Sequence, residues 1–230
     1  MHTFYTENGC LTKDDAKHAF RVLRLTEGDE ITALENNKRF KAVIKEISEK
    51  SARVDIIEEL PSNEPDIKVT LYQGLPKAEK LEFLAQKLTE LGVTALVPVR
   101  MERSVAKMDG EKRLERLERI SKEAVKQCRR SLPLEIYPVT DWKKACSMMQ
   151  NHDLMLVPWE NAESVRLTDI YKAHPEAKDI GILVGCEGGI SENEISDCPA
   201  LPVSLGARIL RAETAAITSC AVVMALYGEI

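Results

Sequence analysis

The chain has 230 residues, 44% of them hydrophobic and 30% charged, with a formal net charge of −5. This balance excludes a disordered or fibrous chain, because it supplies enough apolar surface for a sizeable core. No stretch reaches the roughly 20 apolar residues that cross a bilayer, and the first ten residues lack the pattern of a secretory signal. We expect a globular, cytoplasmic protein of one large or two small domains.

The beginning of the chain is β-rich. Apolar and polar residues alternate, as in half-buried strands, over three short segments: 29–34, 41–47 and 52–58. Residues 60–66 contain two prolines and no apolar periodicity, which is typical of a linker. The sequence therefore predicts a small β domain over 1–66 and a second domain over 67–230.

In the second part, strands alternate with helices. Strands are predicted over 67–73, 93–99, 153–158 and 179–184, and helices over 78–91, 111–128 and 213–226. The first of these helices places Leu81, Leu84 and Leu88 on one face and stops at Gly92, a common helix terminator. This alternation predicts an α/β domain whose mostly parallel sheet is covered on both faces.

Charge is distributed unevenly along the chain. Residues 100–130 contain eleven Lys and Arg against six Asp and Glu, whereas residues 160–200 contain three basic and nine acidic residues. The basic segment could form a footprint for nucleic acid on an otherwise acidic protein. The alternative reading is a solvated helix whose faces carry ion pairs.

The six cysteines form no C-x-x-C pair, so the sequence predicts no metal site. In a chain without a secretory signal they are expected to be reduced thiols.

A glycine-rich loop is predicted after the strand 179–184. Three glycines stand within positions 185–189, where the backbone can turn sharply and approach a ligand. Ligands of open α/β sheets bind at the carboxyl ends of the strands, where this loop should lie. Ser191 and Glu194 form a capping box that predicts a short helix after the loop. The pattern is neither a Rossmann nor a Walker motif, and a tight turn without a ligand is the alternative.

A second segment, 203–215, combines Gly206 with Arg208 and Arg211 just before the predicted last helix. Small residues such as Ala212 and Ala215 begin that helix and allow close packing. In isolation the two arginines could equally be surface charges.

Five segments resemble, in order, those of the bacterial ribosomal RNA small-subunit methyltransferase E family, which belongs to the SPOUT class. The family's glycine loop and its L-G-x-R-I-L-R-x-E-T-A segment resemble Val184–Ile190 and Leu205–Ala215. The other three matching segments are His18–Ile31, Gln86–Val93 and Lys126–Ile136.

Four positions depart from the family pattern. Cys186 replaces a proline and Ile190 a phenylalanine in the glycine loop, while Lys126 replaces a glutamate and Arg129 a glycine. The loss of proline should loosen the loop slightly but leaves its glycines in place. The Arg129 change adds charge where RNA would approach.

The resemblance implies a trefoil-knotted α/β methyltransferase domain preceded by a PUA-like β-barrel, and a homodimer. It also implies S-adenosylmethionine as cofactor, held largely by backbone groups of three loops. The implied cofactor-binding residues are Leu156, Val157, Pro158, Val184, Gly185, Glu187, Gly188, Val203, Leu205, Gly206, Ile209 and Leu210.

The implied reaction is methyl transfer to N3 of a uridine in 16S ribosomal RNA of the small subunit. A cationic cradle for the uracil oxygens would help N3 to lose its proton. Arg130 and Arg211 are the candidates for this cradle, and Glu187 is a third candidate catalytic residue. RNA contacts are expected from His18, Arg21, Arg24, Arg100, Arg103, Arg129 and Arg130.

Two other functions stay open at this stage. One is a non-catalytic RNA-binding factor, and the other is a different SPOUT methyltransferase that acts on a ribose 2′-oxygen or on another base. A dinucleotide-dependent dehydrogenase has little support, because Gln73-Gly74 and the residues after them carry no Rossmann fingerprint.

Overall fold

The computed structural model describes residues 1–48, 51–105, 110–162 and 165–230. These residues form two compact units: Met1–Glu64 with Val125–Leu132, and Pro65–Ala124 with Pro133–Ile230. The first change of unit falls between Glu64 and Pro65, inside the segment predicted as a linker, which contains no helix or strand.

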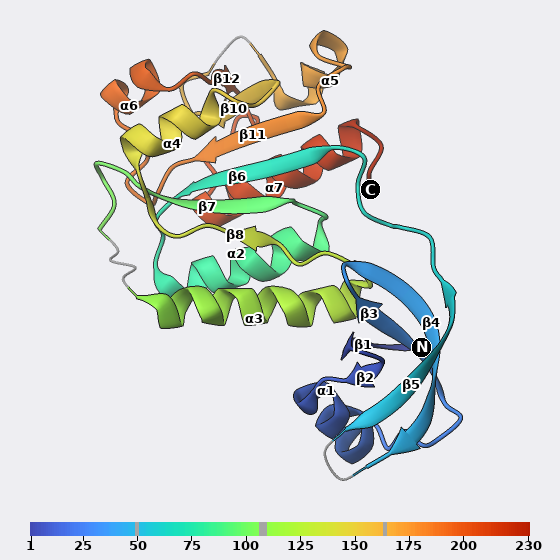
Figure 1. The fold of residues 1–230 in the computed structure, drawn as a ribbon. Helices are drawn as coiled ribbons and strands as arrows, with labels where there is room; N and C mark the ends of the chain where they lie inside the picture. Colours follow the sequence, from blue (N-terminus) through green and yellow to red (C-terminus); the bar gives the residue numbers. More distant parts are fainter. Residues whose placement is uncertain (49–50, 106–109, 163–164) are drawn as a thin grey trace. The chain divides into compact units, whose positions relative to one another are not determined.

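The first unit contains a closed barrel (Figure 1). Its strands are β1 (His2–Glu7), β2 (Cys10–Leu11), β3 (Glu30–Glu35), β4 (Lys38–Ile47) and β5 (Ala52–Glu59), in the order β1-β2-β5-β4-β3. A parallel pairing of β1 with β3 closes the barrel, and the other pairs are antiparallel. Phe4, Ile31 and Ile44 are buried in its core. The sequence predicted β3, β4 and β5 but not β1 or β2, and β2 is too short to show any alternation.

Two tight turns set the register of this barrel. The residues between β1 and β2, Asn8 and Gly9, have φ angles of 53° and 71°, and those between β3 and β4, Asn36 and Asn37, have 51° and 62°. Consecutive positive φ angles give two-residue hairpins the twist that antiparallel strands require. After β2 the chain forms α1 (Lys13–Lys17), which continues directly into a π-helical turn, η1 (His18–Val22).

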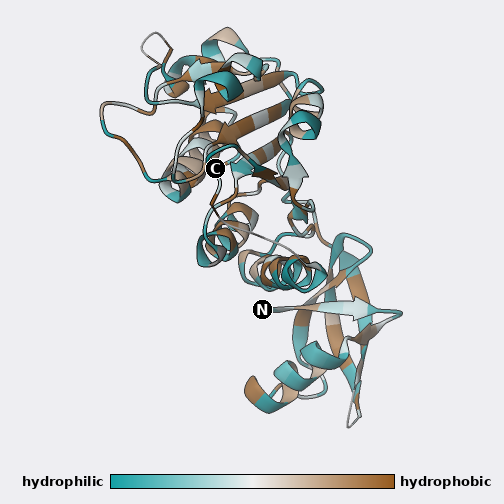
Figure 2. Cartoon of the chain, turned by 90° about the vertical axis from the view of Figure 1, so that its left-hand side faces the viewer, coloured by the Kyte–Doolittle hydropathy of each residue, from teal (hydrophilic) through white to brown (hydrophobic). Residues whose placement is uncertain are grey.

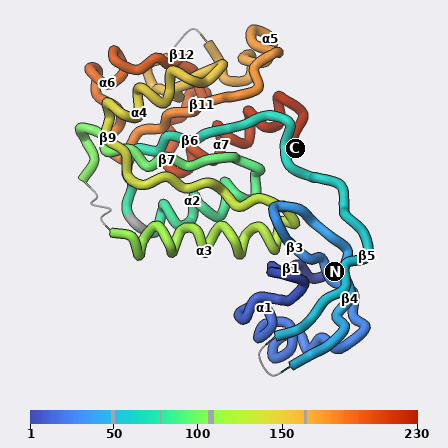
Figure 3. The backbone as a smooth tube through the Cα atoms, viewed as in Figure 1, coloured from blue at the N-terminus to red at the C-terminus, as the bar shows by residue number. Residues whose placement is uncertain are grey.

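The second unit is built on a parallel sheet (Figures 1 and 3). Its strands are β6 (Lys68–Gly74), β7 (Ala95–Arg100), β8 (Glu135–Ile136), β9 (Thr140–Asp141), β10 (Leu154–Pro158), β11 (Asp179–Val184) and β12 (Leu201–Val203). The order is β12-β10-β11-β6-β7-β8, with β9 also beside β7, and every pairing is parallel. The predicted fold class, an α/β domain preceded by a small β-barrel, is confirmed.

Helices cover both faces of the sheet. One face packs against α2 (Ala78–Glu90), α3 (Glu111–Cys128), η2 (Leu167–Asp169), α5 (Ile170–Ala173) and α7 (Ala212–Leu226), and the other against α4 (Trp142–Met149) and α6 (Glu192–Asp197). Neighbouring residues of a strand, such as Leu71 and Tyr72, are buried in opposite cores. The strands are therefore apolar along their length, as Figure 2 shows by their brown colour.

Several helix limits follow from local signals in the sequence. α3 spans the predicted residues, and α2 ends just before Gly92, whose φ is 86°. The predicted capping box of Ser191 and Glu194 is present, with both reciprocal hydrogen bonds, at the start of α6. The predicted limits agree with the structure because each depends on residues within a few positions of the helix end.

The return of the chain after β12 positions the candidate site. β12 lies at the edge of the sheet beside β10, yet the next helix, α7, packs against β6, β11 and α2. Residues 204–211 therefore run back toward the middle of the sheet (Figure 3). This is the part of the chain in which the family resemblance implies a knot.

Arg129 follows the last residue of α3 and has a φ of 64°, where the family pattern has glycine. A side chain is strained in this left-handed region. We expect Arg129→Gly to raise the free energy of unfolding by about 0.5–1 kcal/mol, since the greater freedom of glycine in the unfolded chain offsets part of the relief. The matched control is Arg129→Ala, which removes the same charge but keeps the strain. Urea denaturation in which both variants behave alike would contradict this explanation.

Candidate functional site

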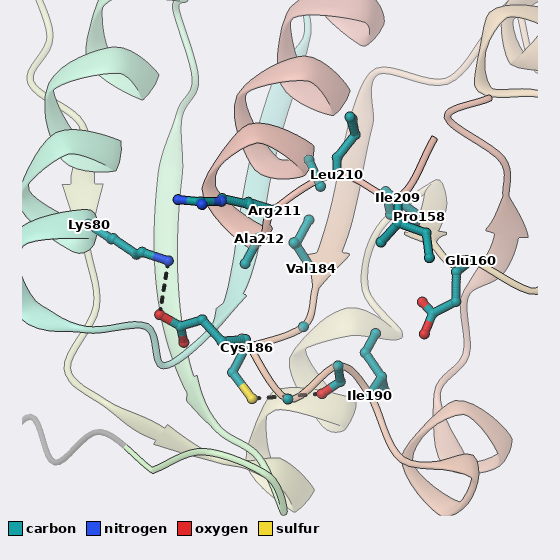
Figure 4. A pocket seen from close by; sticks show the side chains of 15 residues that line it. Lys80, Pro158, Glu160, Val184, Cys186, Ile190, Ile209, Leu210, Arg211 and Ala212 are labelled. Carbon is teal, nitrogen blue, oxygen red and sulfur yellow. Dashed lines mark hydrogen bonds and ion pairs between the residues drawn. The ribbon is translucent and has the colours of Figure 1, made fainter. Parts of the chain in front are cut away.

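A cavity of about 490 Å³ lies where the ends of β10 and β11 meet the start of α7 (Figure 4). It is lined by Pro158 at the end of β10 and Glu160 just after it, and by residues 184–190 at and after the end of β11. Residues 209–212 and Ala215 around the start of α7 and Lys80 of α2 complete the lining. A smaller cavity of about 200 Å³ shares Pro158, Ile209 and Ala215 with it and extends along Trp159 and residues 204–208. The two glycine-bearing segments selected from the sequence therefore face the same space.

The loop after β11 folds tightly on itself. The N–H of Gly189 donates to the carbonyl oxygen of Cys186 at 2.9 Å, and Gly189 has a φ of 75°. A Cβ at Gly185 would lie 2.8 Å from Ile190, and one at Gly188 would lie 2.9 Å from the Cβ of Arg103. Both glycines are thus required by contacts within the protein.

Gln73, a buried residue of β6, also fixes the loop, and sequence reasoning assigned it no role here. Its side-chain Nε2 donates to the carbonyl oxygens of Gly74 and Gly185, both at 3.0 Å. On the far side of the loop, Glu194 accepts a hydrogen bond from the N–H of Glu102 at 2.8 Å. A backbone group of the loop is therefore held by a side chain from β6, and the helix that follows the loop is bonded to the segment after β7.

Lys80 joins the two segments that line the cavity. Its Nζ lies 3.1 Å from Glu187 in the glycine loop and 3.0 Å from Glu213 in the first turn of α7. The hydrogen bond to Glu213 is the largest of the effects that raise the pKa of Lys80. Burial alone would raise the pKa of both carboxyls, but backbone hydrogen bonds and the Lys80 ammonium outweigh it, so the net shift is downward. All three groups are charged at neutral pH.

Most of the predicted cofactor-binding residues line one of the two cavities. Pro158, Val184, Gly185, Glu187, Gly188, Ile209 and Leu210 line the larger one, while Leu205 and Gly206 line the smaller one. Leu156, Val157 and Val203 line neither, because their side chains are buried in the sheet. These three residues hold the strands from which the lining loops emerge.

The three predicted catalytic residues belong to different units. Arg211 and Glu187 line the larger cavity, and Arg211 immediately precedes α7. Arg130 lies in the first unit, where it is 6% exposed. Its Nε and Nη2 donate to Glu64 Oε2 at 2.9 and 2.7 Å.

Glu64 binds the segment after α3 with both of its oxygens. Oε1 accepts hydrogen bonds from the N–H groups of Ser131 and Leu132, at 2.7 and 3.0 Å. Burial raises the pKa of Glu64, but its bonds to Arg130, Ser131 and Leu132 lower it by more, so its pKa lies below the ordinary value. Sequence reasoning missed Glu64, which stands in the segment predicted to be a linker.

The predicted RNA-binding residues are divided between the units. His18, Arg21, Arg24 and Arg129 are exposed in the first unit, as are Arg100 and Arg103 in the second. Arg103 Nη1 also donates to the carbonyl oxygen of Gly188 at 3.2 Å, so this arginine braces the glycine loop.

Lys126, one of the departures from the family pattern, has a partner in its own unit. Its Nζ lies 2.8 Å from Asp15, whose other oxygen accepts a hydrogen bond from the N–H of Tyr5. Both side chains of the pair are largely buried. The lysine therefore neutralises the largely buried carboxylate of Asp15, which lies on α1 and accepts a hydrogen bond from β1.

Within the described ranges, no group of three or more His, Cys, Asp or Glu side chains could hold a metal ion. All six cysteines are free thiols. No helix among the residues that the structure describes is both long and apolar enough to span a membrane.

Two sequence families match the chain. One is described as an RNA methyltransferase domain and matches residues 62–224, and the other as an RNA methyltransferase PUA domain and matches residues 11–57. Ribosomal RNA small subunit methyltransferase E of Bacillus subtilis is 33% identical over 217 residues, which cover 89% of this chain and 85% of that protein. The protein of the same name from Aquifex aeolicus is 31% identical over 240 residues, which cover 97% of this chain and 99% of that protein.

Solved structures extend this similarity. Ribosomal RNA small subunit methyltransferase E from Neisseria gonorrhoeae, bound to S-adenosyl methionine, has a TM-score of 0.89 and 30% identity, covering 99% of this chain and 98% of that one. A methyltransferase from Legionella pneumophila, also bound to this cofactor, has a TM-score of 0.84 and 29% identity, covering 97% of this chain and 96% of that one.

Removing the Glu64 carboxylate should destabilise the protein in a pH-dependent way. We expect Glu64→Gln to lower the free energy of unfolding by about 2 kcal/mol at pH 7, because buried Arg130 and the N–H groups of Ser131 and Leu132 lose the carboxylate that binds them. The folded-state pKa of Glu64 is lowered, so its contribution is present above about 4.3, the ordinary value. As pH falls from there through the folded-state value, the difference from wild type should shrink. Urea denaturation between pH 7 and 3 measures this, with Glu59→Gln, which breaks an exposed pair with Lys38, as control.

Removing the Lys80 ammonium should open the larger cavity. In Lys80→Met, Glu187 and Glu213 would face each other without a counter-charge, and their repulsion would move the glycine loop away from α7. We expect affinity for S-adenosylmethionine to fall about tenfold, or about 1.4 kcal/mol, in calorimetric titration. Lys77→Met, which removes an exposed lysine beside the same helix, is the control. Equal affinities of the two variants would mean that Lys80 does not organise the cavity.

Proposed function

The chain belongs to the ribosomal RNA small subunit methyltransferase E family, and on this premise we propose that it is an S-adenosylmethionine-dependent enzyme that methylates N3 of a uridine in 16S ribosomal RNA. The observation that carries the proposal is the cavity formed where the glycine loop and the start of α7 converge. The two segments with the closest family resemblance supply most of its lining.

The lining suits this cofactor in size and in its apolar side chains. A volume of about 490 Å³ is in the usual range for small-molecule sites. Pro158, Ile190 and Leu210 offer apolar contact to an adenine ring, and Ile209 is 86% exposed at the edge. Two carboxylates in the lining, Glu160 and Glu187, balance the cations Lys80 and Arg211, and a carboxylate near the sulfur would complement a sulfonium. The bound cofactor would supply an activated methyl group.

The chain's own residues would orient the base and stabilise its charge. N3 of uracil becomes nucleophilic when it loses a proton and negative charge spreads to the ring oxygens. Arg211 is suited to bind those oxygens, because it is exposed at the cavity and carries a planar set of donors. Glu187 and Glu213 are suited to hold Lys80 rather than to accept the proton, since their pKa values are lowered. A catalytic role for Arg130 stays a prediction.

The substrate is proposed to be ribosomal RNA of the small subunit, contacted by the predicted residues of both units. The barrel would serve as the RNA-binding, PUA-like domain over 1–66, and 67–230 as the methyltransferase domain. We place the enzyme in the cytoplasm, where its six free thiols would stay reduced.

We also propose that the enzyme is a homodimer. α7 is apolar around most of its circumference, yet Ile217, Val222 and Leu226 are only partly buried. A helix of this kind is normally covered on all sides, and a second copy of the chain would cover it.

The deciding experiment is methyl transfer to small ribosomal subunits from a strain that lacks this protein. The purified protein is given labelled S-adenosylmethionine, and the modified nucleoside is identified by mass spectrometry. Methyl on N3 of uracil supports the proposal. Methyl on a ribose would indicate a different SPOUT activity, and RNA binding without transfer would indicate a non-catalytic factor.

A cavity-filling variant ties this activity to the cavity. Ala215 lines both cavities from the first turns of α7, so leucine, a good helix former, should fill the space without breaking the helix. We expect Ala215→Leu to weaken cofactor binding by at least about tenfold, or about 1.4 kcal/mol. Ala225→Leu, at an exposed position of the same helix, should bind as wild type does. Unchanged binding by Ala215→Leu would place the cofactor elsewhere.

A further inference from the structure

The barrel unit has a cavity of its own, of whose lining the predicted site residues include only Arg21. It measures about 630 Å³ and lies between the helical segment α1–η1 and the end of β4. Lys13, Lys17 and Arg21 supply cations to its lining, Phe20 an aromatic ring, and Ile47 and Ser48 its opposite wall. A nucleotide fits within such a volume.

The cations of this cavity differ from other lysines of the barrel. Lys38, Lys41 and Lys45 on β4 each pair with a carboxylate. By contrast, Lys13, Lys17 and Arg21 are exposed and form no ion pair with any residue that the structure describes. They recur every four residues, which places them along one side of the helical segment. Asp14 is the single acidic residue in the lining, so the cavity carries a net positive charge.

Phe20 gives the cavity an apolar surface beside these cations. Its ring packs against the core of the barrel but is only half buried, and it lines the cavity. The helix around it is a π-helical turn, a rare distortion that is frequent at functional sites. Aromatic rings next to lysines and arginines are the usual combination for binding single-stranded nucleic acid.

We propose that this cavity is a nucleotide subsite for single-stranded RNA. Lys13, Lys17 and Arg21 contact successive phosphates, and one unstacked base lies against Phe20. The subsite adds Lys13, Lys17 and Phe20 to the RNA contacts predicted from the sequence, and it rests on the proposed function for its substrate class. It supplies affinity for RNA and leaves cofactor binding unaffected, because no residue of the cofactor cavity takes part.

Binding of a fluorescein-labelled oligouridylate to the full chain, followed by anisotropy at several salt concentrations, tests the subsite. For Lys13→Ala/Lys17→Ala we expect a Kd about tenfold higher and a salt dependence weaker by about 1.4 in logarithmic slope, since two phosphate contacts are lost. The matched control is Lys38→Ala/Lys45→Ala, which removes the same charge from the same barrel and should change Kd by less than about twofold.

A second variant separates base contact from charge. Phe20→Leu keeps apolar volume against the barrel core but loses the aromatic face, so Kd should rise about fivefold to tenfold with the salt slope unchanged. Thermal melting and the cofactor Kd, both expected to match wild type, show that each variant is folded.

Either of two results overturns the subsite: the Lys13/Lys17 variant binds RNA like its control, or folded Phe20→Leu binds like wild type. Failure of the proposed function looks different. In that case both variants lose RNA affinity as expected, but the wild-type protein transfers no methyl group to small ribosomal subunits.

Discussion

The site depends on one ammonium group held between two carboxylates. Lys80, Glu187 and Glu213 come from α2, from the loop after β11 and from α7, and the two ion pairs measure 3.1 and 3.0 Å. Without the lysine, the glycine loop and α7 would bring two negative charges together beside the cavity. With the lysine present, both segments bind the same ammonium group, and the cavity lies between them. The position of this lysine thus determines the spacing of the two segments that line the cavity.

The same ion pairs indicate different roles for the carboxylates and for the cations at the cavity. Because the carboxyl pKa values are lowered, Glu187 and Glu213 serve structure and charge balance. In the proposed reaction, the cations at the cavity would stabilise an anionic base, while the carboxylates of the lining would favour a sulfonium. Charges of opposite sign would thus act on two different reactants within one site.

Local signals in the sequence predicted much of this structure. Gly92 ended α2, the Ser191–Glu194 box started α6, and the predicted bounds of α3 were correct, because each depends on residues close in the chain. The family resemblance selected the two segments that line the cavity.

What the sequence could not predict are tertiary contacts. Lys80 and Gln73 act on a loop more than 100 residues away, and nothing near either residue signals that contact. Glu64 carried no signal either, because its partners lie 66 to 68 residues further along the chain. The predicted catalytic residue Arg130 illustrates the same limit, since its motif gives no sign of the carboxylate that binds it.

The discontinuity of the first unit has a consequence for biosynthesis. Residues 125–132 complete that unit, and they bring the partners of both Asp15 and Glu64. A nascent chain that has emerged only to Glu64 therefore has all five barrel strands but lacks the cationic partners of both carboxylates. The amino-terminal unit is therefore complete only after the last turn of α3 and the residues that follow it, up to 132, have left the ribosome.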